Sequence, residues 1–169
     1  RFAGVGVMND DGKQATRTWR SNQNHGRELM PAIVDSMAEL SLPAQDVTHI
    51  GVALGPGGFS AVRVGIRAAL GLAVAKKLPV LGVLTHDIEA RPYFVEATDA
   101  SPLYSLIPAG RNEISWTRHN QSQDRSIGIT SPDELVSQME PDSLVCGEAC
   151  DLMAGLIDKS RFRGHAAPT

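Results

Sequence analysis

The stretch "GVALGPGGFSAVRVGIRAALGLAVAKKLPVLGV", residues 51–83, determines the fold expected for this chain. An apolar run over residues 47–54 leads into a loop that contains three glycines and a proline. An apolar helix over about residues 61–77 leaves this loop, and a second apolar run follows at 79–84. A strand, a helix and a strand within this length predict a right-handed parallel crossover.

The segments on either side extend this pattern. The turn residues "NDDG" at 9–12 separate two β-forming segments and predict a hairpin over 2–20. Apolar residues at helical spacing predict a helix over 25–40, with Pro31 in its first turn or at a bend. Further along we expect strands around the turn "PAGRN" (108–112), a helix at 131–139 that opens with a Ser-x-x-Glu capping box, and a strand, turn and helix over 143–160. This order is typical of an α/β protein with a mixed sheet.

The glycine loop is the first candidate site. A glycine-rich turn before a helix can bind an anion, because its backbone approaches a ligand closely and the first N–H groups of the helix point outward. No Gly-Lys-Ser/Thr follows, so this is not a Walker A loop, and Ser60 stands where a dinucleotide-binding loop has its third glycine. A tight structural turn is therefore favoured over a phosphate site. The candidate nucleotide- or anion-binding residues are Gly55, Gly57, Gly58, Ser60 and Arg63.

The helix after the loop suggests an interface. Arg63 and Arg67 share one face near its N-terminus, where positive charge is unfavourable unless an anion compensates; a solvated pair or an internal salt bridge is the alternative. Residues 68–75 are apolar on all sides, and such a helix is expected to be buried all round. We predict that this helix and the one at 25–40 form a protein–protein interface, with Leu29, Ile33, Met37, Arg67, Ala68, Ala69, Leu72 and Ala75.

Composition excludes several classes of function. Hydrophobic residues make up 42% and charged residues 21%, which indicates a folded chain, and the net charge of −3 argues against binding nucleic acid alone. The two cysteines, in "CGEAC", have no second pair at zinc spacing and are expected to be reduced thiols. No apolar run reaches the length of about 20 residues that a membrane span needs, and no signal peptide is visible. We expect a cytoplasmic protein without a membrane partner.

At the glycine loop the sequence becomes similar to a known family. "GPGGFSAVRVG" (55–65) resembles the G-P-G-S-F-T-G-L-R-I-G signature of the bacterial TsaB proteins, formerly called YeaZ. "HGRELMP" (25–31) resembles the opening of that family's first helix, and "LPVLGVLTHDIEA" (78–90) and "IPAGRNEISW" (107–116) resemble two later segments. The loop identities are Gly55, Pro56, Gly57, Phe59, Arg63 and Gly65, and the departures are Gly58 and Ala61. The resemblance is faint beyond residue 116.

The resemblance to TsaB implies a fold of the actin/Hsp70/sugar-kinase (ASKHA) type, with two lobes built from mixed sheets and flanking helices. Members of that family begin with a strand that carries an aspartate ("L-A-I-D-T"), and this first strand is missing from the sequence here. We place an N-terminal lobe with the glycine loop and the interface helices at 1–96. A smaller, shortened C-terminal α/β lobe is placed at 97–169.

The same resemblance implies a non-catalytic partner, or scaffold, of the TsaD-type transferase that threonylcarbamoylates adenosine 37 of tRNA. The implied partners are the TsaD-type paralogue and a TsaE-type ATPase, with a homodimer as a further state and tRNA contacts only through the complex. No catalytic residue, metal site or cofactor is expected. Two alternatives remain: an ATP-using small-molecule kinase of this fold, and a nucleotide-sensing module whose glycine loop binds ATP or ADP without chemistry.

Overall fold

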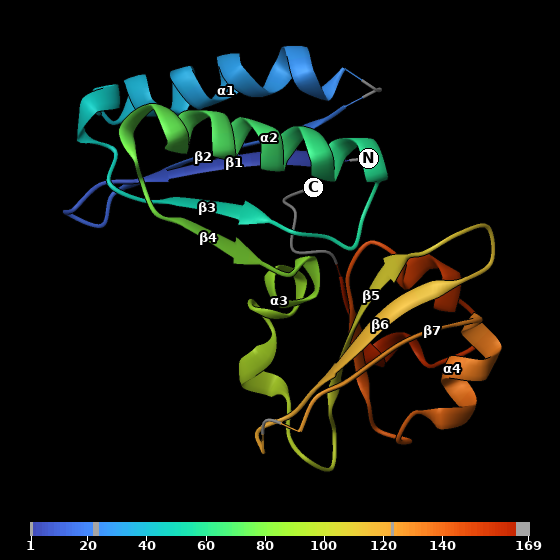
Figure 1. Ribbon diagram of the computed structural model, residues 1–169. Coiled ribbons are helices and arrows are strands. Elements are labelled where there is room, and N and C mark those ends of the chain that lie inside the picture. The colour runs from blue at the N-terminus through green and yellow to red at the C-terminus, as the bar shows by residue number, and fades with distance from the viewer. Residues whose placement is uncertain (1, 22–23, 123, 165–169) are drawn as a thin grey trace. The chain divides into compact units, whose positions relative to one another are not determined.

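Two units make up the described part of the chain. The computed structural model describes residues 2–21, 24–122 and 124–164 (Figure 1). Contacts within the chain group the described residues of 2–54 and 58–83 as unit 1, and those of 55–57 and 84–164 as unit 2. This division between Val83 and Leu84 comes earlier in the chain than the boundary at 96/97 predicted from the sequence.

Unit 1 opens with the predicted hairpin. Strands β1 (Phe2–Met8) and β2 (Gln14–Arg20) pair antiparallel, with Phe2 opposite Arg20 and Met8 opposite Gln14. The turn closes when the Gly12 N–H donates to the Asn9 carbonyl over 3.0 Å, and the Asn9 side chain accepts from the Lys13 N–H over 2.9 Å. Gly12 has φ 77°, a left-handed conformation that glycine adopts without steric cost.

Helix α1 (His25–Glu39) covers this hairpin. Pro31 lies inside the helix, one turn beyond the predicted first-turn position. Proline has no backbone N–H, so the Arg27 carbonyl lacks the hydrogen bond that residue 31 of a regular helix would donate to it. Apolar packing against β1 and β2 therefore has to stabilise the helix in spite of that loss.

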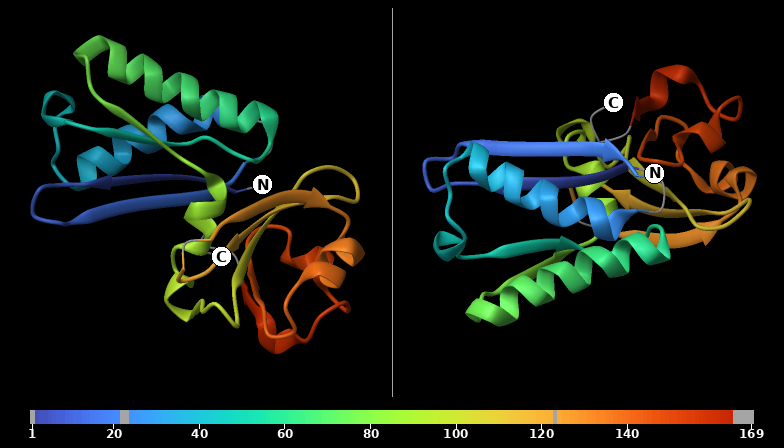
Figure 2. Two further views of the ribbon diagram at one scale, coloured as in Figure 1. Left: turned by 60° about the horizontal axis from the view of Figure 1, so that its bottom comes forward. Right: turned by 90° about the horizontal axis from the view of Figure 1, so that it is seen from above.

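The predicted crossover is confirmed. Strand β3 (Ile50–Ala53) leads through the glycine loop into α2 (Phe59–Lys76) and then into β4 (Val80–Val83), which is parallel to β3. Helix α2 covers β3 and β4, and it lies beside α1 (Figure 2). It ends in a Schellman-type turn: the Leu78 N–H donates to the Ala73 carbonyl over 3.0 Å, and Lys77 has φ 55°.

Two expectations about unit 1 are wrong. The strand expected from the apolar run at 47–54 is shorter, since β3 spans Ile50–Ala53, and it is half-buried because it pairs with β4 alone. Helix α2 is not buried on every side, since only Ala69 and Ala73 are enclosed and the rest of its apolar surface is partly or fully exposed. Across unit 1, the buried residues that the structure describes all have small side chains: Ala15, Ser21, Ser36, Ala69 and Ala73.

Unit 2 is built on a five-stranded mixed sheet in the order β7-β6-β5-β8-β9. The strands are β5 (Leu103–Pro108), β6 (Ile114–His119), β7 (Ser126–Thr130), β8 (Leu144–Cys146) and β9 (Phe162–Gly164). Strands β5, β6 and β7 are antiparallel neighbours, whereas β8 runs parallel to both β5 and β9. The predicted strands around "PAGRN" are confirmed, while β7 and β9 were not predicted.

Helices cover both faces of this sheet. Helix α3 (Thr85–Ala90) packs on β5 and β6, and α4 (Pro132–Gln138) packs through Leu135 into the main core (Figure 1). The capping box predicted for α4 is confirmed at its N-cap, where the Ser131 hydroxyl accepts from the Glu134 N–H over 3.3 Å. The main core consists of Tyr104, Leu106, Ile114, Leu135, Val145, Ala149, Cys150 and Met153.

The last predicted helix is wrong. Between β8 and β9 the chain forms short 3-10 turns at Cys150–Met153 and Lys159–Arg161 instead of a helix, and similar turns occur at Ala44–Asp46 and Phe94–Glu96. The apolar residues of this segment are used in packing instead: Cys150 and Met153 enter the main core directly from the turn.

Glu140 connects several elements of unit 2. Its carboxylate accepts from the Tyr104 hydroxyl over 3.0 Å and from the Arg118 guanidinium over 2.8 Å, and from the Ser143 hydroxyl over 3.1 Å. Burial works against the charge on Glu140, but its backbone bond and the Arg118 contact outweigh that cost, so its pKa is lowered. Burial, followed by the same carboxylate, raises the pKa of Tyr104 to about 12.

Candidate functional site: the glycine loop and the exposed faces of two helices

The glycine loop has a defined backbone. Gly55 has φ 95°, and the Gly55–Pro56 peptide bond is cis. The Gly55 carbonyl accepts from the Thr85 N–H over 2.8 Å, and the Gly58 carbonyl accepts from the Val62 N–H over 3.0 Å. No side chain caps the N-terminus of α2, so the first N–H groups of the helix are not satisfied by a capping side chain.

The predicted anion-binding residues are divided between the units. Gly55 and Gly57 belong to unit 2, whereas Gly58, Ser60 and Arg63 belong to unit 1. The sequence pattern treated them as one cradle because they are neighbours along the chain. An anion site at this loop stays a prediction.

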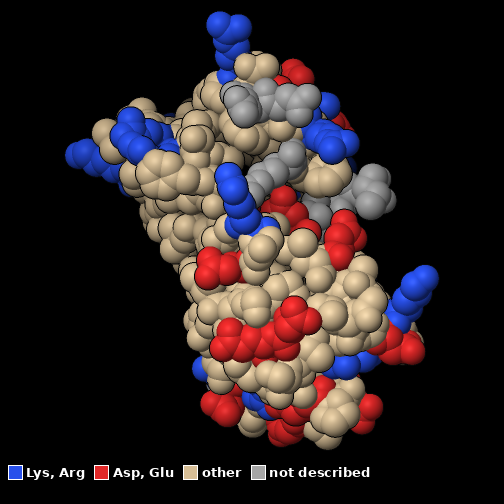
Figure 3. Space-filling model, turned by 90° about the vertical axis from the view of Figure 1, so that its right-hand side faces the viewer, with Lys and Arg blue, Asp and Glu red and all other residues tan. Residues whose placement is uncertain are grey.

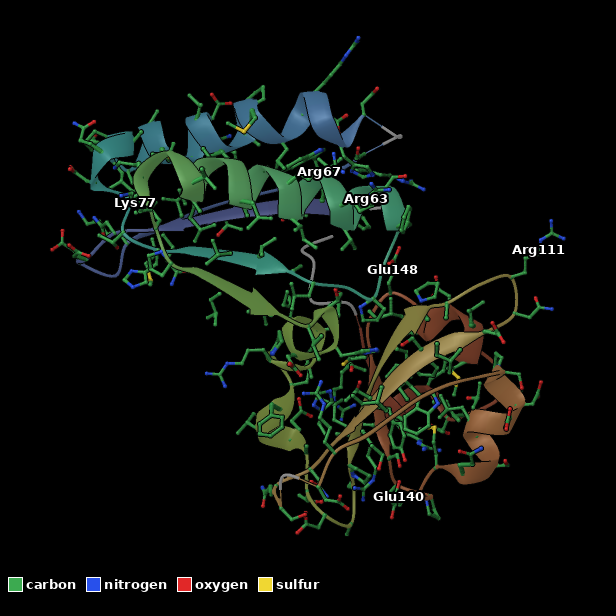
Figure 4. All side chains as sticks on the ribbon, viewed as in Figure 1. Arg63, Arg67, Lys77, Arg111, Glu140 and Glu148 are labelled. Carbon is green, nitrogen blue, oxygen red and sulfur yellow. The ribbon has the colours of Figure 1, made fainter. Side chains whose placement is uncertain are left out.

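Arg63 and Arg67 project from α2 into solvent (Figure 4). The Arg63 guanidinium lies over the ring of Phe59, 4.9 Å from its centre, and that ring is 74% exposed. Such a contact between a cation and an aromatic face is worth about 0.5–1 kcal/mol at an exposed site. Among the ion pairs between described residues, none includes Arg63 or Arg67, so neither arginine forms the internal salt bridge considered from the sequence with a described partner.

The predicted interface residues lie on two helices that pack against each other. Ala69 is buried between elements of unit 1, while Leu29, Ile33, Met37 and Ala68 are half-buried. The exposed members of the set are Arg67, Leu72 and Ala75. The predicted set therefore contains residues that hold unit 1 together as well as residues that are open to a partner.

Four larger apolar side chains on these helices were missed. Met30 and Val34 on α1 are 41% and 59% exposed, and Leu70 and Val74 on α2 are 49% and 78% exposed. Each pair is spaced four residues apart and so shares one helix face. That spacing is visible in the sequence, but it does not indicate which apolar face of a helix is left exposed. An open groove beside Val74 is lined by Leu70, Ala73, Val74, Lys77, Leu78 and Val80.

The reactive side chains of unit 2 are mostly enclosed. Cys146 and Cys150 are buried free thiols, and burial raises the pKa of Cys150 to about 12. A thiol with a raised pKa is a poor nucleophile and a poor metal ligand. Asp87 pairs with Arg125 over 2.9 Å, and Glu89 is buried. Over the ranges that the structure describes, no three His, Cys, Asp or Glu side chains are grouped to hold a metal ion.

The charge of the chain is unevenly distributed. Residues 1–83 contain nine Lys and Arg against six Asp and Glu, a net charge of +3, whereas residues 84–169 contain seven against thirteen, a net charge of −6. Figure 3 shows several acidic side chains gathered on one face of unit 2. In the described part of the chain, no helix is both long and apolar enough to cross a membrane.

A family model matches residues 20–139, which is more than half of the chain: "TsaD: tRNA N6-adenosine threonylcarbamoyltransferase". The chain is 26% identical over 120 residues to the tRNA threonylcarbamoyladenosine biosynthesis protein TsaB of Escherichia coli K12, covering 71% of this chain and 50% of that protein. It is 29% identical over 157 residues to the tRNA N6-adenosine threonylcarbamoyltransferase of Fusobacterium nucleatum, covering 85% of this chain and 42% of that protein. The chain thus spans about half the length, or less, of these curated relatives.

Solved structures show the same fold. YeaZ from Pseudomonas aeruginosa superimposes with a TM-score of 0.74 at 22% identity, covering 98% of this chain and 82% of that chain. A second structure is of an uncharacterized protein with similarity to peptidase YEAZ from Pseudomonas aeruginosa. It superimposes with a TM-score of 0.77 at 21% identity, covering 99% of this chain and 81% of that chain. The expected mixed sheet with flanking helices is confirmed in unit 2, whereas the described strands of unit 1 form one antiparallel and one parallel pair. The chain belongs to the family of the tRNA N6-adenosine threonylcarbamoyltransferase model, and its assignment to the TsaB (YeaZ) proteins is confirmed.

Proposed function

We propose that this chain is a non-catalytic partner of a TsaD-type transferase in the threonylcarbamoylation of tRNA adenosine 37. The observation that carries the proposal is the exposed apolar surface of α1 and α2, formed by Met30 and Val34 on one helix and Leu70 and Val74 on the other. Side chains of this kind are costly to leave in water and are typical of a surface that another protein covers.

The family supports the choice of partner. Relatives of this chain include proteins named for threonylcarbamoyladenosine biosynthesis and proteins named as the transferase itself. Two proteins of one fold can present similar helix pairs to each other, and the small residues of α2 let a partner helix approach closely. A TsaE-type ATPase, a homodimer of the isolated chain and a cytoplasmic location belong to the same proposal.

The positions of the reactive groups also favour a scaffold. Both cysteines and two of the described histidines, His86 and His119, are buried in unit 2 and engaged in packing or hydrogen bonds. A nucleophile or a general base must reach its substrate, and these groups do not reach the surface. We accordingly propose that the role needs no cofactor and that tRNA is contacted only through the complex.

The test is complex formation measured by size-exclusion chromatography with light scattering. The chain is mixed with the TsaD-type paralogue from the same source, and a one-to-one complex is expected. Val74→Glu places a charge on the exposed surface of α2 without disturbing a core, and it should weaken the complex at least tenfold, because burying an unpaired charge costs several kcal/mol. Leu72→Glu should act in the same direction.

A matched control separates this effect from a general change in charge. Val95 is 86% exposed in unit 2, and Val95→Glu should leave the complex intact. Equal weakening by Val74→Glu and Val95→Glu, or no complex with the unmodified chain, would contradict the proposal.

The uncapped N-terminus of α2, close to Arg63, supports a second candidate function. Backbone N–H groups and a guanidinium suit a phosphate, so the glycine loop could serve an ATP-using kinase or a nucleotide sensor. Calorimetry with ADP and a Mg-ATP turnover assay distinguish these. Nucleotide binding with turnover favours a kinase, and binding without turnover favours a sensor. The absence of both binding and turnover favours the scaffold.

A further inference from the structure

Five polar side chains meet between α3 and the sheet of unit 2, in a place where an apolar core would be expected. Strand register puts residues opposite one another on the same face of a sheet, and alternate residues of one strand also share a face. Ser105 of β5 lies opposite Thr117 of β6, and Ser115 and His119 flank Thr117 on the same side. His86 enters this face from α3. The exposed fractions are 0% for Ser105 and Thr117, 2% for His86, 6% for Ser115 and 9% for His119.

The two imidazoles are linked through one hydroxyl group. The Ser105 oxygen lies 2.9 Å from Nδ1 of His86 and 3.0 Å from Nε2 of His119, and Nε2 of His86 lies 3.0 Å from the Ser115 oxygen. With both imidazoles neutral, two opposite arrangements of hydrogens satisfy every contact. In one, His119 donates to Ser105, Ser105 donates to Nδ1 of His86, and His86 donates from Nε2 to Ser115; in the other, each of these three bonds runs in the reverse direction. We refer to these four residues as the His86–His119 chain.

Protonation removes both arrangements. When both imidazoles are protonated, Nδ1 of His86 and Nε2 of His119 each direct an N–H at the Ser105 oxygen, and the Ser105 hydroxyl must turn to the Thr117 carbonyl, 3.5 Å away. Two positive charges would then face one hydroxyl group in a buried space. Of the charged groups nearby, Arg125 adds to the repulsion, and Asp87 already pairs with Arg125 over 2.9 Å. The ring of Phe94, edge-on to His119 at 6.3 Å, offers no counter-charge.

We propose that the His86–His119 chain is an acid-sensitive latch that holds α3 on the sheet of unit 2 while both histidines are neutral and releases it when they are protonated. Burial is the main reason that the pKa of each imidazole is lowered, to about 4, with His119 acting further on His86 and Arg125 acting further on His119. A lowered histidine pKa means that the folded state holds fewer protons than the open state. Stability from the latch is therefore complete above the ordinary histidine pKa of about 6.5 and is lost as the pH falls towards about 4.

The distribution of histidines along the polypeptide allows the pH effect of the latch to be measured separately from other titrations. The other histidines that the structure describes, His25 and His49, both lie in unit 1. Opening of α3 should increase with acidity by up to about tenfold per pH unit for each latch histidine below pH 6.5. The same interval should leave the β1–β2 hairpin unchanged, which makes that hairpin an internal reference.

Hydrogen exchange of the intact chain between pH 7 and pH 5, corrected for the intrinsic pH dependence of exchange, tests the proposal. Protection of residues 85–90 and of β5 and β6 should fall, while protection of β1 and β2 should not. His86→Gln and His119→Gln should each flatten the pH dependence, and His49→Gln, an exposed histidine of unit 1, should not change it. An NMR titration of the unmodified chain gives a decision even if the latch variants do not fold. Titration of His86 and His119 close to pH 6.5, or protection of α3 that is independent of pH, would overturn the latch.

Discussion

Unit 1 and unit 2 bury very different side chains. In unit 2, large residues such as Leu106, Ile114, Leu135 and Met153 are fully enclosed. In unit 1, the buried residues that the structure describes are small, and valines and leucines of α1 and α2 are open to solvent. Unit 2 thus completes its own core, whereas unit 1 leaves apolar surface uncovered. The difference teaches that a chain of average hydrophobicity can place its self-sufficient core and its interaction surface in separate parts of the sequence.

The sharpest test of this comparison removes a leucine from each unit. Leu106→Ala empties a fully buried site in unit 2 and should cost about 2–5 kcal/mol of unfolding free energy, because the cavity adds to the lost transfer energy. Leu70→Ala, at a side chain that is 49% exposed in unit 1, should cost about 1 kcal/mol or less. Urea unfolding followed by hydrogen exchange in each unit measures both losses. Similar losses at the two sites would mean that the units do not differ in this way.

A second comparison concerns ion pairs. Glu140→Gln should lower the free energy of unfolding by about 1–2 kcal/mol, since the carboxylate contacts Arg118 and two hydroxyl groups in a partly buried position. The lowered pKa of Glu140 gives the sign: its contribution is complete above the ordinary value of 4.5 and is lost as the pH falls below it. In unit 1, Glu39→Gln removes an exposed pair with Arg17, at 3.2 Å, and should change stability by about 0.5 kcal/mol or less. Thermal unfolding at pH 7 and pH 4 should show a smaller effect of Glu140→Gln at the lower pH.

Two serines should respond in opposite directions. The Ser36 hydroxyl is fully buried on α1 and has no hydrogen-bond partner among the described residues, so Ser36→Ala should stabilise unit 1 by about 0.5–1 kcal/mol. The Ser131 hydroxyl caps α4, so Ser131→Ala should destabilise unit 2 by about 1 kcal/mol. Chemical denaturation of the two variants gives the signs directly. A loss on replacing Ser36 would indicate that its hydroxyl has a partner after all.

The smallest effect is expected at the end of α2. Lys77 has φ 55°, a conformation that costs free energy for any residue with a Cβ, and Lys77→Gly should stabilise unit 1 by about 0.5 kcal/mol. Lys76 precedes it inside the helix, where Lys76→Gly should cost about 1 kcal/mol. Melting temperatures of the two variants, measured side by side, should therefore move in opposite directions from that of the unmodified chain.

Much of the fold could be predicted because local signals agree with it. The "NDDG" turn, the βαβ stretch and the capping serine all specify short-range geometry, and each is found in the structure. The misses have a common cause. Strand β7 is short and lies at an edge of the sheet, and the segment after Cys146 is held by contacts with distant strands. The segment after Cys146 leaves no periodic pattern in the sequence, and the alternation of Ile127 and Ile129 in β7 extends over five residues only.

The candidate site was harder to predict for a related reason. Periodicity identifies which residues share a helix face, but it does not say whether that face is covered. Ala69 and Val74 look alike as small apolar positions of α2, yet one is 6% and the other 78% exposed. The buried histidines were missed because His86 and His119 are far apart in sequence and meet only when β5 and β6 pair.

The burial of Cys146 and Cys150 has a consequence for oxidation. Both thiols lie in unit 2, where the raised pKa keeps them protonated and the surrounding core excludes peroxide and disulfide reagents. An oxidant reaches the sulfur atoms only in molecules whose unit 2 has opened. The rate at which the two cysteines are oxidised is therefore set by how often the better-packed half of the chain opens, and any substitution that loosens that half also shortens the lifetime of its free thiols.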